Sequence, residues 1–219
     1  NKSYPCFMVT AEIDSIKTLQ LHVTKEAIIY RGHIDADFPV LSIDSLQGNV
    51  YVSNSLIVIK DRRISLDSII LEAKYQDNAQ SIIARTDFAQ AMIKGQYKLT
   101  QLGDIFLNAI EPYYALERDS ASVLLDDYDF ELSGSVSDHP TIRAFLPDLT
   151  RLSPIIMAGA FAPSGWNVSA TAPSIIYGTS RVSRLIFAAE EKDKELKVNL
   201  TAAEIKNGEN LNLINTRFN

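Results

Sequence analysis

The stretch Ala91-Met92-Ile93-Lys94-Gly95-Gln96-Tyr97-Lys98-Leu99 has an apolar residue or glycine at every second position, mostly separated by lysine and glutamine. Successive side chains of a β-strand point to opposite faces of the sheet, so this spacing predicts a strand with one apolar and one hydrated face. The same period recurs in segments 28–38, 69–75, 128–136, 166–172 and 196–202. A parallel sheet that is buried on both faces would instead show continuous Val and Ile runs. We therefore expect a mainly β protein with a long, curved, antiparallel or mixed sheet of roughly a dozen strands.

Two segments depart from this alternation and predict short helices. In segment 101–117, apolar residues repeat at a spacing of three to four, which is typical of an amphipathic helix. Thr100 or Asp104 could cap its start, and Pro112 falls in its last turn.

The second helix is expected over residues 138–148, with Asp138 as the cap and Pro140 in the first turn. Its apolar face would consist of Ile142, Phe145 and Leu146. The whole chain, residues 1–219, then forms one β-domain. Its first sheet region covers 1–100, and its second covers 123–219 and includes the second helix.

Two short motifs recur between and within the strands. An apolar-Asp-Ser-apolar motif occurs at 13–16, 43–46 and 66–69, where Asp and Ser side chains can bond nearby backbone N–H groups at a corner or bulge. An apolar-x-Gly-x-apolar motif centres on Gly32, Gly48, Gly95, Gly134 and Gly159. Glycine on the apolar face of a strand marks curvature or close approach, so these positions predict a sheet that bends repeatedly at one level.

The glycine pattern leaves two interpretations open. In one, the glycines are bulges in a sandwich or another sheet closed on itself. In the other, the sheet folds into a U-shaped trough whose apolar face lines an open groove. For the open groove, the candidate lipid-binding residues flank the glycines, and they are Tyr30, Ile34, Leu46, Val50, Ile93, Tyr97, Leu132, Val136, Met157 and Phe161.

Composition and motifs disfavour several classes of function. The 219 residues carry a net charge of −6 and show no basic cluster, which argues against a nucleic-acid partner. We find no nucleophile elbow, P-loop, zinc-protease motif or paired cysteines, and the chain has a single cysteine. We therefore expect no enzyme activity, no catalytic residue, no cofactor and no metal. The start of the sequence has neither an initiator Met nor an apolar leader, so we expect a piece of a longer protein.

Several stretches resemble the AsmA-like, TamB-type proteins of Gram-negative envelopes. These stretches are Leu41–Val50, Ile64–Ala73, Ile93–Leu99 leading into the first helix, and Phe130–Val136 followed by His139-Pro140-Thr141-Ile142 and Pro147-Asp148-Leu149. Together they cover most of the chain. Their order and the intervening helices carry the resemblance more than any single motif does.

The resemblance implies a specific fold, location and function. The fold would be a β-taco-like trough with an apolar interior, in an internal segment of a periplasmic protein anchored in the inner membrane. The function would be to shield or conduct phospholipid or another acyl-chain lipid between the two membranes. By the same resemblance, the protein would support outer-membrane biogenesis and protein secretion together with an outer-membrane barrel protein.

Two alternatives remain open at the level of sequence. The chain could dock outer-membrane strands by adding them to a free sheet edge. It could also be a surface β-sandwich that binds carbohydrate, with Trp166 and the Tyr113-Tyr114 pair as a sugar platform.

Overall fold

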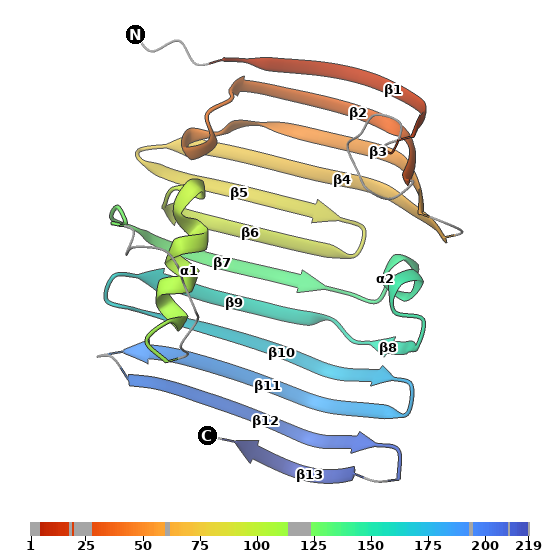
Figure 1. Ribbon diagram of the computed structural model, residues 1–219, viewed down its shortest axis with the longest axis vertical. Helices are drawn as coiled ribbons and strands as arrows, with labels where there is room; N and C mark the ends of the chain where they lie inside the picture. Colours follow the sequence, from red (N-terminus) through yellow and green to blue (C-terminus); the bar gives the residue numbers. More distant parts are fainter. Residues whose placement is uncertain are drawn as a thin grey trace.

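The computed structural model describes residues 5–17, 19, 28–59, 62–113, 124–192, 195–209 and 211–218. Within them, thirteen strands form a single antiparallel sheet, in which each strand of the main path pairs with the next (Figure 1). β8 lies off this path and pairs with β10. The strands are β1 (Phe7–Lys17), β2 (Ile28–Val40), β3 (Gln47–Ile59), β4 (Arg62–Gln76), β5 (Ala79–Thr86), β6 (Ala89–Gln96), β7 (Asp129–Val136), β8 (Leu149–Leu152), β9 (Ile155–Ala162), β10 (Gly165–Tyr177), β11 (Ser180–Lys192), β12 (Glu195–Asn207) and β13 (Leu211–Phe218).

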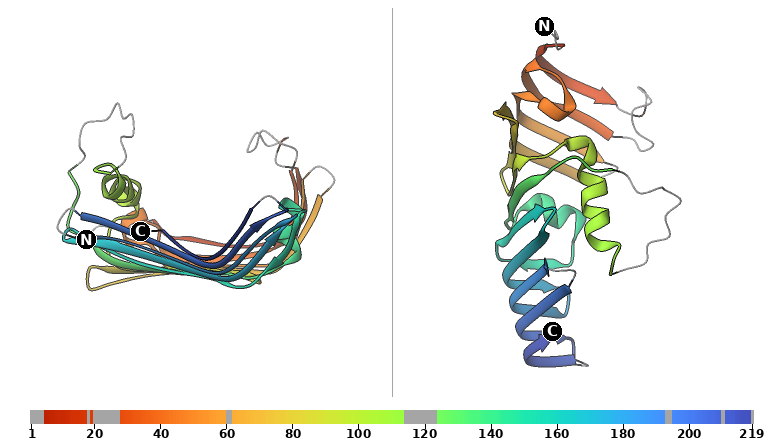
Figure 2. Two further views of the ribbon diagram at one scale, coloured as in Figure 1. Left: turned by 90° about the horizontal axis from the view of Figure 1, so that it is seen from below. Right: turned by 90° about the vertical axis from the view of Figure 1, so that its left-hand side faces the viewer.

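The sheet is open, and its strands bend strongly along their own length (Figure 2). Viewed along the direction in which the strands stack, it forms a trough with a concave face and two raised sides (Figure 2). β1 and β13 lie at the two ends of the strand order and do not pair with each other. The mainly β trough expected from the sequence is therefore confirmed, with a purely antiparallel sheet. A sandwich or closed sheet is wrong, because no second sheet covers the concave face among the described residues.

The sharp bend of the sheet coincides with residues in the left-handed backbone region. Asn54 in β3, Arg184 in β11 and Asn215 in β13 have φ near +50°. Such a residue interrupts the regular pleat. Opposite Asn54, the apolar positions of β4 switch from Ile64 and Leu66 to Ile69, Leu71 and Ala73.

The glycines, with the exception of Gly32, do not mark this bend, which corrects the sequence-based expectation. Gly48 and Gly95 lie near strand ends, and Gly134 and Gly159 lie in the middle of the sheet. At Gly95, the absence of a side chain allows β6 and β7 to approach each other closely. The φ of Gly95 is +141°, and a Cβ added there would lie 2.2 Å from the carbonyl oxygen of Asp129 on β7.

The Asp-Ser motifs lie at three different irregularities. The first spans a register shift between β1 and β2, and the second forms the 3₁₀ turn η1 (Ile43–Ser45). The third lies at the bend of β4, where the carboxylate of Asp87 accepts hydrogen bonds from the backbone N–H of Asp67 at 2.6 Å and of Ser68 at 3.1 Å. The motif therefore marks corners and bulges, as predicted.

The helix α1 (Leu102–Ile110) follows the 3₁₀ turn η2 (Leu99–Gln101) and is shorter than predicted. It ends at Ile110 because Pro112 has no N–H to continue the helical ladder. Residues 114–117 of the predicted range lie outside the described residues. Neither Thr100 nor Asp104 caps the helix by its side chain. Instead, the Asp44 carboxylate of η1 accepts hydrogen bonds from Thr100 N and Oγ1, each at 3.0 Å.

The helix α2 (Pro140–Phe145) is also shorter than predicted, and its cap differs. His139 is the N-cap, with Nδ1 accepting from Thr141 N at 3.2 Å, while Asp138 forms an ion pair with Arg143. Pro140 occupies the first turn, as expected. Phe145 and Leu146 are about half exposed and Thr141 is buried, so the predicted apolar face is wrong. The helix packs beside β4, at the side of the trough opposite α1 (Figure 1).

Candidate functional site: the concave face of the trough

The concave face is the one on which α1 lies (Figure 2). Directly paired residues on neighbouring strands project to the same face, so strand register identifies which side chains line it. A central row of paired residues crosses twelve strands and contains only apolar residues and glycine. It consists of Val9, Ala36, Val50, Leu71, Ala84, Ala91, Gly134, Met157, Ala170, Phe187, Leu200 and Phe218.

A second row, two residues along each strand toward α1, is also entirely apolar or glycine. It contains Gly48, Ala73, Ile82, Ile93, Leu132, Gly159, Val168, Ala189 and Val198. A third row lies beneath and beside α1, and we call it the aromatic row. It contains Tyr75, Gln80, Gly95, Phe130, Phe161, Trp166, Glu191 and Leu196.

Six of the ten sequence-predicted groove residues lie on this concave face outside the aromatic row. Val50 and Met157 belong to the central row, and Ile93 and Leu132 are a directly paired couple in the second row. Ile34 pairs with Val52, and Val136 pairs with Ile155, one step beyond the central row. The structure therefore brings these six residues onto one surface, as the alternation predicts.

Two further candidates, Tyr97 and Phe161, are buried in a cluster with Ile105 of α1. Phe130 stacks on Phe161 with ring centroids 5.3 Å apart, and Phe106 of α1 meets Phe161 edge-on at 5.0 Å. Ile105 of α1 and Phe130 are each only 1% exposed. Such aromatic contacts fix the helix to the sheet. In this part of the trough, the apolar face forms a core that contains Tyr97 and Phe161, although Phe161 also lines the hollow beside α1.

The last two candidates lie apart from the three rows. Tyr30 belongs to a separate row beyond the bend, with Ile16, Ile57 and Ile64, and its hydroxyl lies 3.3 Å from Ser55 Oγ. Leu46 follows η1 in the link to β3 and is half-buried. Neither residue continues the surface formed by the other candidates.

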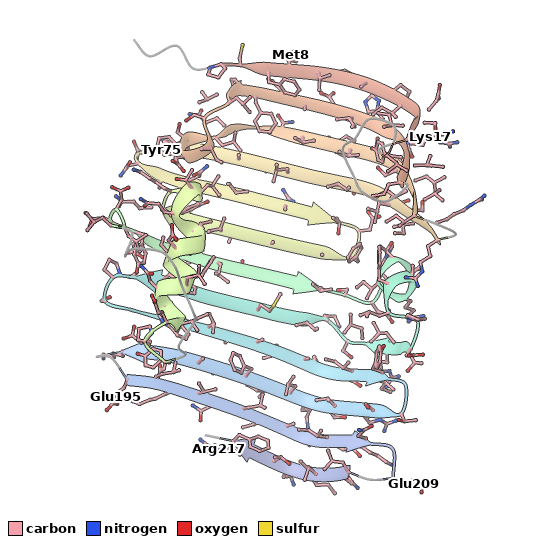
Figure 3. The ribbon with its side chains drawn as sticks, viewed as in Figure 1. Met8, Lys17, Tyr75, Glu195, Glu209 and Arg217 are labelled. Atoms are coloured by element: carbon pink, nitrogen blue, oxygen red, sulfur yellow. The ribbon has the colours of Figure 1, made fainter. Side chains whose placement is uncertain are left out.

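Two apolar hollows remain open on the concave face. One of about 460 Å³ lies over β5, β6, β7 and β9, and its lining includes Ile82, Ile93, Leu132, Val136 and Met157. Another of about 320 Å³ lies between the C-terminal half of α1 and strands β9–β12. Figure 3 places Tyr75 and Glu195 on the side of the trough that α1 occupies, and Lys17 and Glu209 on the opposite side.

The convex face carries charged side chains between its apolar ones. Arg85 and Glu72 form an ion pair at 2.5 Å, and His33 Nδ1 lies 2.7 Å from Glu12 Oε2. Lys94 pairs across strands with Glu131, one residue away from the apolar Ile93–Leu132 couple. The sheet is therefore amphipathic, with its more apolar surface inside the curve.

Two ionisable contacts lie in the segment that leads from β6 into α1. Burial raises the pKa of Tyr97 to about 12. Lys98 forms an ion pair with Asp126 at 2.5 Å, and this hydrogen bond and charge hold the pKa of Asp126 below its usual range. The buried Tyr97 ring therefore holds this segment to the core under α1, and the Lys98 ion pair holds it to the residues that precede β7.

Among the described residues, no three His, Cys, Asp or Glu side chains gather in a way that could hold a metal ion. No helix in the described ranges is long and apolar enough to cross a membrane.

We did not expect from the sequence that Phe187 and Ala189 of β11 belong to the concave face. Alternation at 185–189 could have indicated it, whereas contact with α1 could not be inferred without the register.

These features define an open, single-sheet β protein with an apolar concave face, partly covered by one helix. Comparisons of the chain with known protein families, with curated proteins and with solved structures found no match.

Proposed function

We propose that the chain is a segment of a trough that shields or conducts acyl-chain lipid. One observation carries this proposal: the uninterrupted apolar row that crosses twelve strands of the concave face, together with the parallel second row. An exposed apolar surface of this extent usually has a ligand or partner, since water wets it at a cost in free energy.

The dimensions of the surface suit an extended lipid chain. Strands stack about 4.8 Å apart, so twelve strands give a path on the order of 50 Å. Burial of each CH₂ group contributes about 0.8 kcal/mol, without any need for directional polar contacts. A shallow apolar trough can therefore hold an acyl chain while leaving it free to slide.

The resemblance to TamB and AsmA-like proteins supplies the setting for this proposal. The longer protein would be anchored in the inner membrane and extend through the periplasm, where its trough would carry phospholipid toward the outer membrane. An outer-membrane barrel protein would be its partner at the far end. No catalytic residue is needed for such passage.

A pair of charged substitutions tests the lipid function. In Ile93→Asp with Leu132→Asp, two carboxylates face each other in the second row, where they repel acyl chains. The matched control is Ser135→Asp with Ile156→Asp, because these residues pair directly one position away from the Gly134–Met157 couple, face the convex side and do not line the hollow over Ile93 and Leu132. Retention of radiolabelled phospholipid by the purified chain should fall at least tenfold in the first variant and change little in the control.

The fold must be monitored in both variants by circular dichroism and urea unfolding. Equal lipid retention by the two folded variants would contradict the proposal. Global unfolding of the first variant alone would mean that Ile93 and Leu132 form a closed core, and the groove assignment would fail.

A second candidate function is strand addition, which the two open ends of the sheet favour. β1 and β13 each pair with only one neighbour among the described strands. An unpaired edge offers backbone N–H and C=O groups to a strand of a partner protein. In that case, proline substitutions along β13 would weaken binding of an outer-membrane barrel protein. The Ile93→Asp, Leu132→Asp variant would weaken it less.

A further inference from the structure

The cavity beside α1 differs from the open part of the trough because it has walls on two sides. Phe106, Ala109 and Ile110 of α1 form one wall, and β9–β12 form the other. Its volume of about 320 Å³ lies at the small end of the range for ligand pockets, about 300 to 1,000 Å³. All of its lining side chains are apolar apart from the Tyr113 hydroxyl and the Trp166 indole N–H. That N–H donates to the Ala109 carbonyl oxygen at 3.2 Å.

One carboxylate borders this cavity from an adjoining hollow. Glu191 on β11 pairs directly with Trp166 on one side and with Leu196 on the other, and both of these residues line the cavity. Glu191 therefore projects from the same face of the sheet. It is the single carboxylate in the three rows that cross the concave face.

The surroundings of Glu191 combine aromatic rings with negative charge. Tyr113 shares a hydrogen bond with Glu191; burial raises the pKa of Tyr113, and the charge of Glu191 raises it further. An adjoining hollow of about 380 Å³ shares Phe161 and Trp166 with the cavity. Three carboxylates and one lysine border that hollow, and they are Asp129, Glu190, Glu191 and Lys192.

We propose that this cavity binds an amphiphile with a cationic amine head group, whose acyl chain fills the apolar space and whose ammonium lies between Glu191 and the neighbouring rings. Ammonium groups are attracted both to carboxylates and to the faces of Trp and Tyr. The excess of carboxylates at this end disfavours an anionic head group. The inference rests on the proposed lipid function, and it adds a fixed site with a preference for head-group charge to a path that is otherwise unselective.

The single tryptophan of the chain, Trp166, reports on the site. We expect its fluorescence to change on titration with dodecyltrimethylammonium below the micelle concentration. Dodecyl sulfate, which has the same chain but a negative head group, should bind at least tenfold more weakly. Circular dichroism at each concentration verifies that the sheet stays folded.

A matched pair of substitutions tests the carboxylate. Glu191→Gln should weaken dodecyltrimethylammonium binding roughly tenfold, which corresponds to about 1.4 kcal/mol. Glu131→Gln removes the same charge from a residue that pairs with Lys94 and Ala160, faces the convex side and lines neither hollow. Its affinity for the probe should stay within about twofold of the unsubstituted chain.

The outcomes separate this inference from the proposed function. Equal affinity for the two head groups, or an equal loss in both variants, would overturn the assignment of Glu191 while leaving acyl-chain binding in place. No response of Trp166 to either amphiphile would overturn the cavity as a binding site. The open trough over Ile93 and Leu132 is tested separately by its own charged variants.

Discussion

Gly95 lies at the point where β6 and β7 approach each other beneath the start of α1. Its positive φ and the nearby Asp129 carbonyl leave no room for a side chain. The sequence motif around Gly95 predicted curvature of the strand. The structure shows instead that the backbone of β7 approaches Gly95 closely. Alternation identified the residue's face, but the neighbouring strand's carbonyl could not be placed without the register.

Substitution of Gly95 by alanine should lower the stability of the sheet. An added Cβ would contact Asp129 O, and an L-residue is strained at this φ, so we expect a loss of more than about 1 kcal/mol in the free energy of unfolding. Gly103→Ala in α1 is the control, because a Cβ there meets nothing within 4 Å. It should be neutral or stabilising by up to about 1 kcal/mol. Urea unfolding measures both, and equal effects would contradict the close approach.

Tyr97 should make stability depend on pH at the alkaline end. The folded protein holds the hydroxyl proton until its pKa of about 12, whereas the unfolded chain releases it near 10.0. The folded state therefore binds more protons between these values. The contribution of Tyr97 to the free energy of unfolding is fully present below pH 10. It is lost as the pH rises toward 12, by an amount on the order of 2 kcal/mol.

Comparison with Tyr97→Phe isolates this contribution from that of the other tyrosines. The variant should lose less stability between pH 10 and 12 than the original chain does, as measured by urea unfolding at each pH. Parallel pH profiles for the two proteins would mean that Tyr97 ionises normally and is not buried under α1.

At the scale of elements, α1 determines which part of the concave face stays open. Its existence and apolar face followed from the spacing of Leu102, Ile105, Phe106 and Ala109, and its end followed from Pro112. Its position did not, because the residue that holds its start is Asp44, more than fifty residues earlier in the chain. The α2 face was misjudged for a related reason: with β4 beside the helix, Thr141 is buried in preference to Phe145.

Removal of the Asp44 carboxylate should loosen the start of α1. Asp44→Ala eliminates the hydrogen bonds from Thr100 N and Oγ1 and should cost about 1 kcal/mol, as for a lost helix cap. Hydrogen exchange of the α1 amides should accelerate, while that of β10–β12 should not. Asp14→Ala, at the matching position of the Asp-Ser motif in β1, is an exposed control that should leave α1 exchange unchanged.

At the scale of the molecule, period-two alternation was sufficient to predict one β-rich chain with an apolar face. The trough itself depends on the bends at Asn54, Arg184 and Asn215, of which the sequence gives little sign, since arginine seldom adopts a positive φ. Tyr30 was placed in the groove because alternation was extended through the register shift between Arg31 and His33 of β2, and the structure sets it in a separate row with Ile16, Ile57 and Ile64. Candidates in the regular parts of strands, such as Ile93 and Leu132, pair directly and share one face, as alternation predicts.

The most direct test is photo-crosslinking at two neighbouring residues of β6. A photoreactive amino acid at Ile93 faces the concave surface, and at Lys94 it faces the convex surface. With the protein expressed in cells that incorporate radiolabelled lipid, we expect lipid adducts at Ile93 and none at Lys94. Adducts at neither position, or equally at both, in a folded protein would contradict the proposal that the concave face carries lipid.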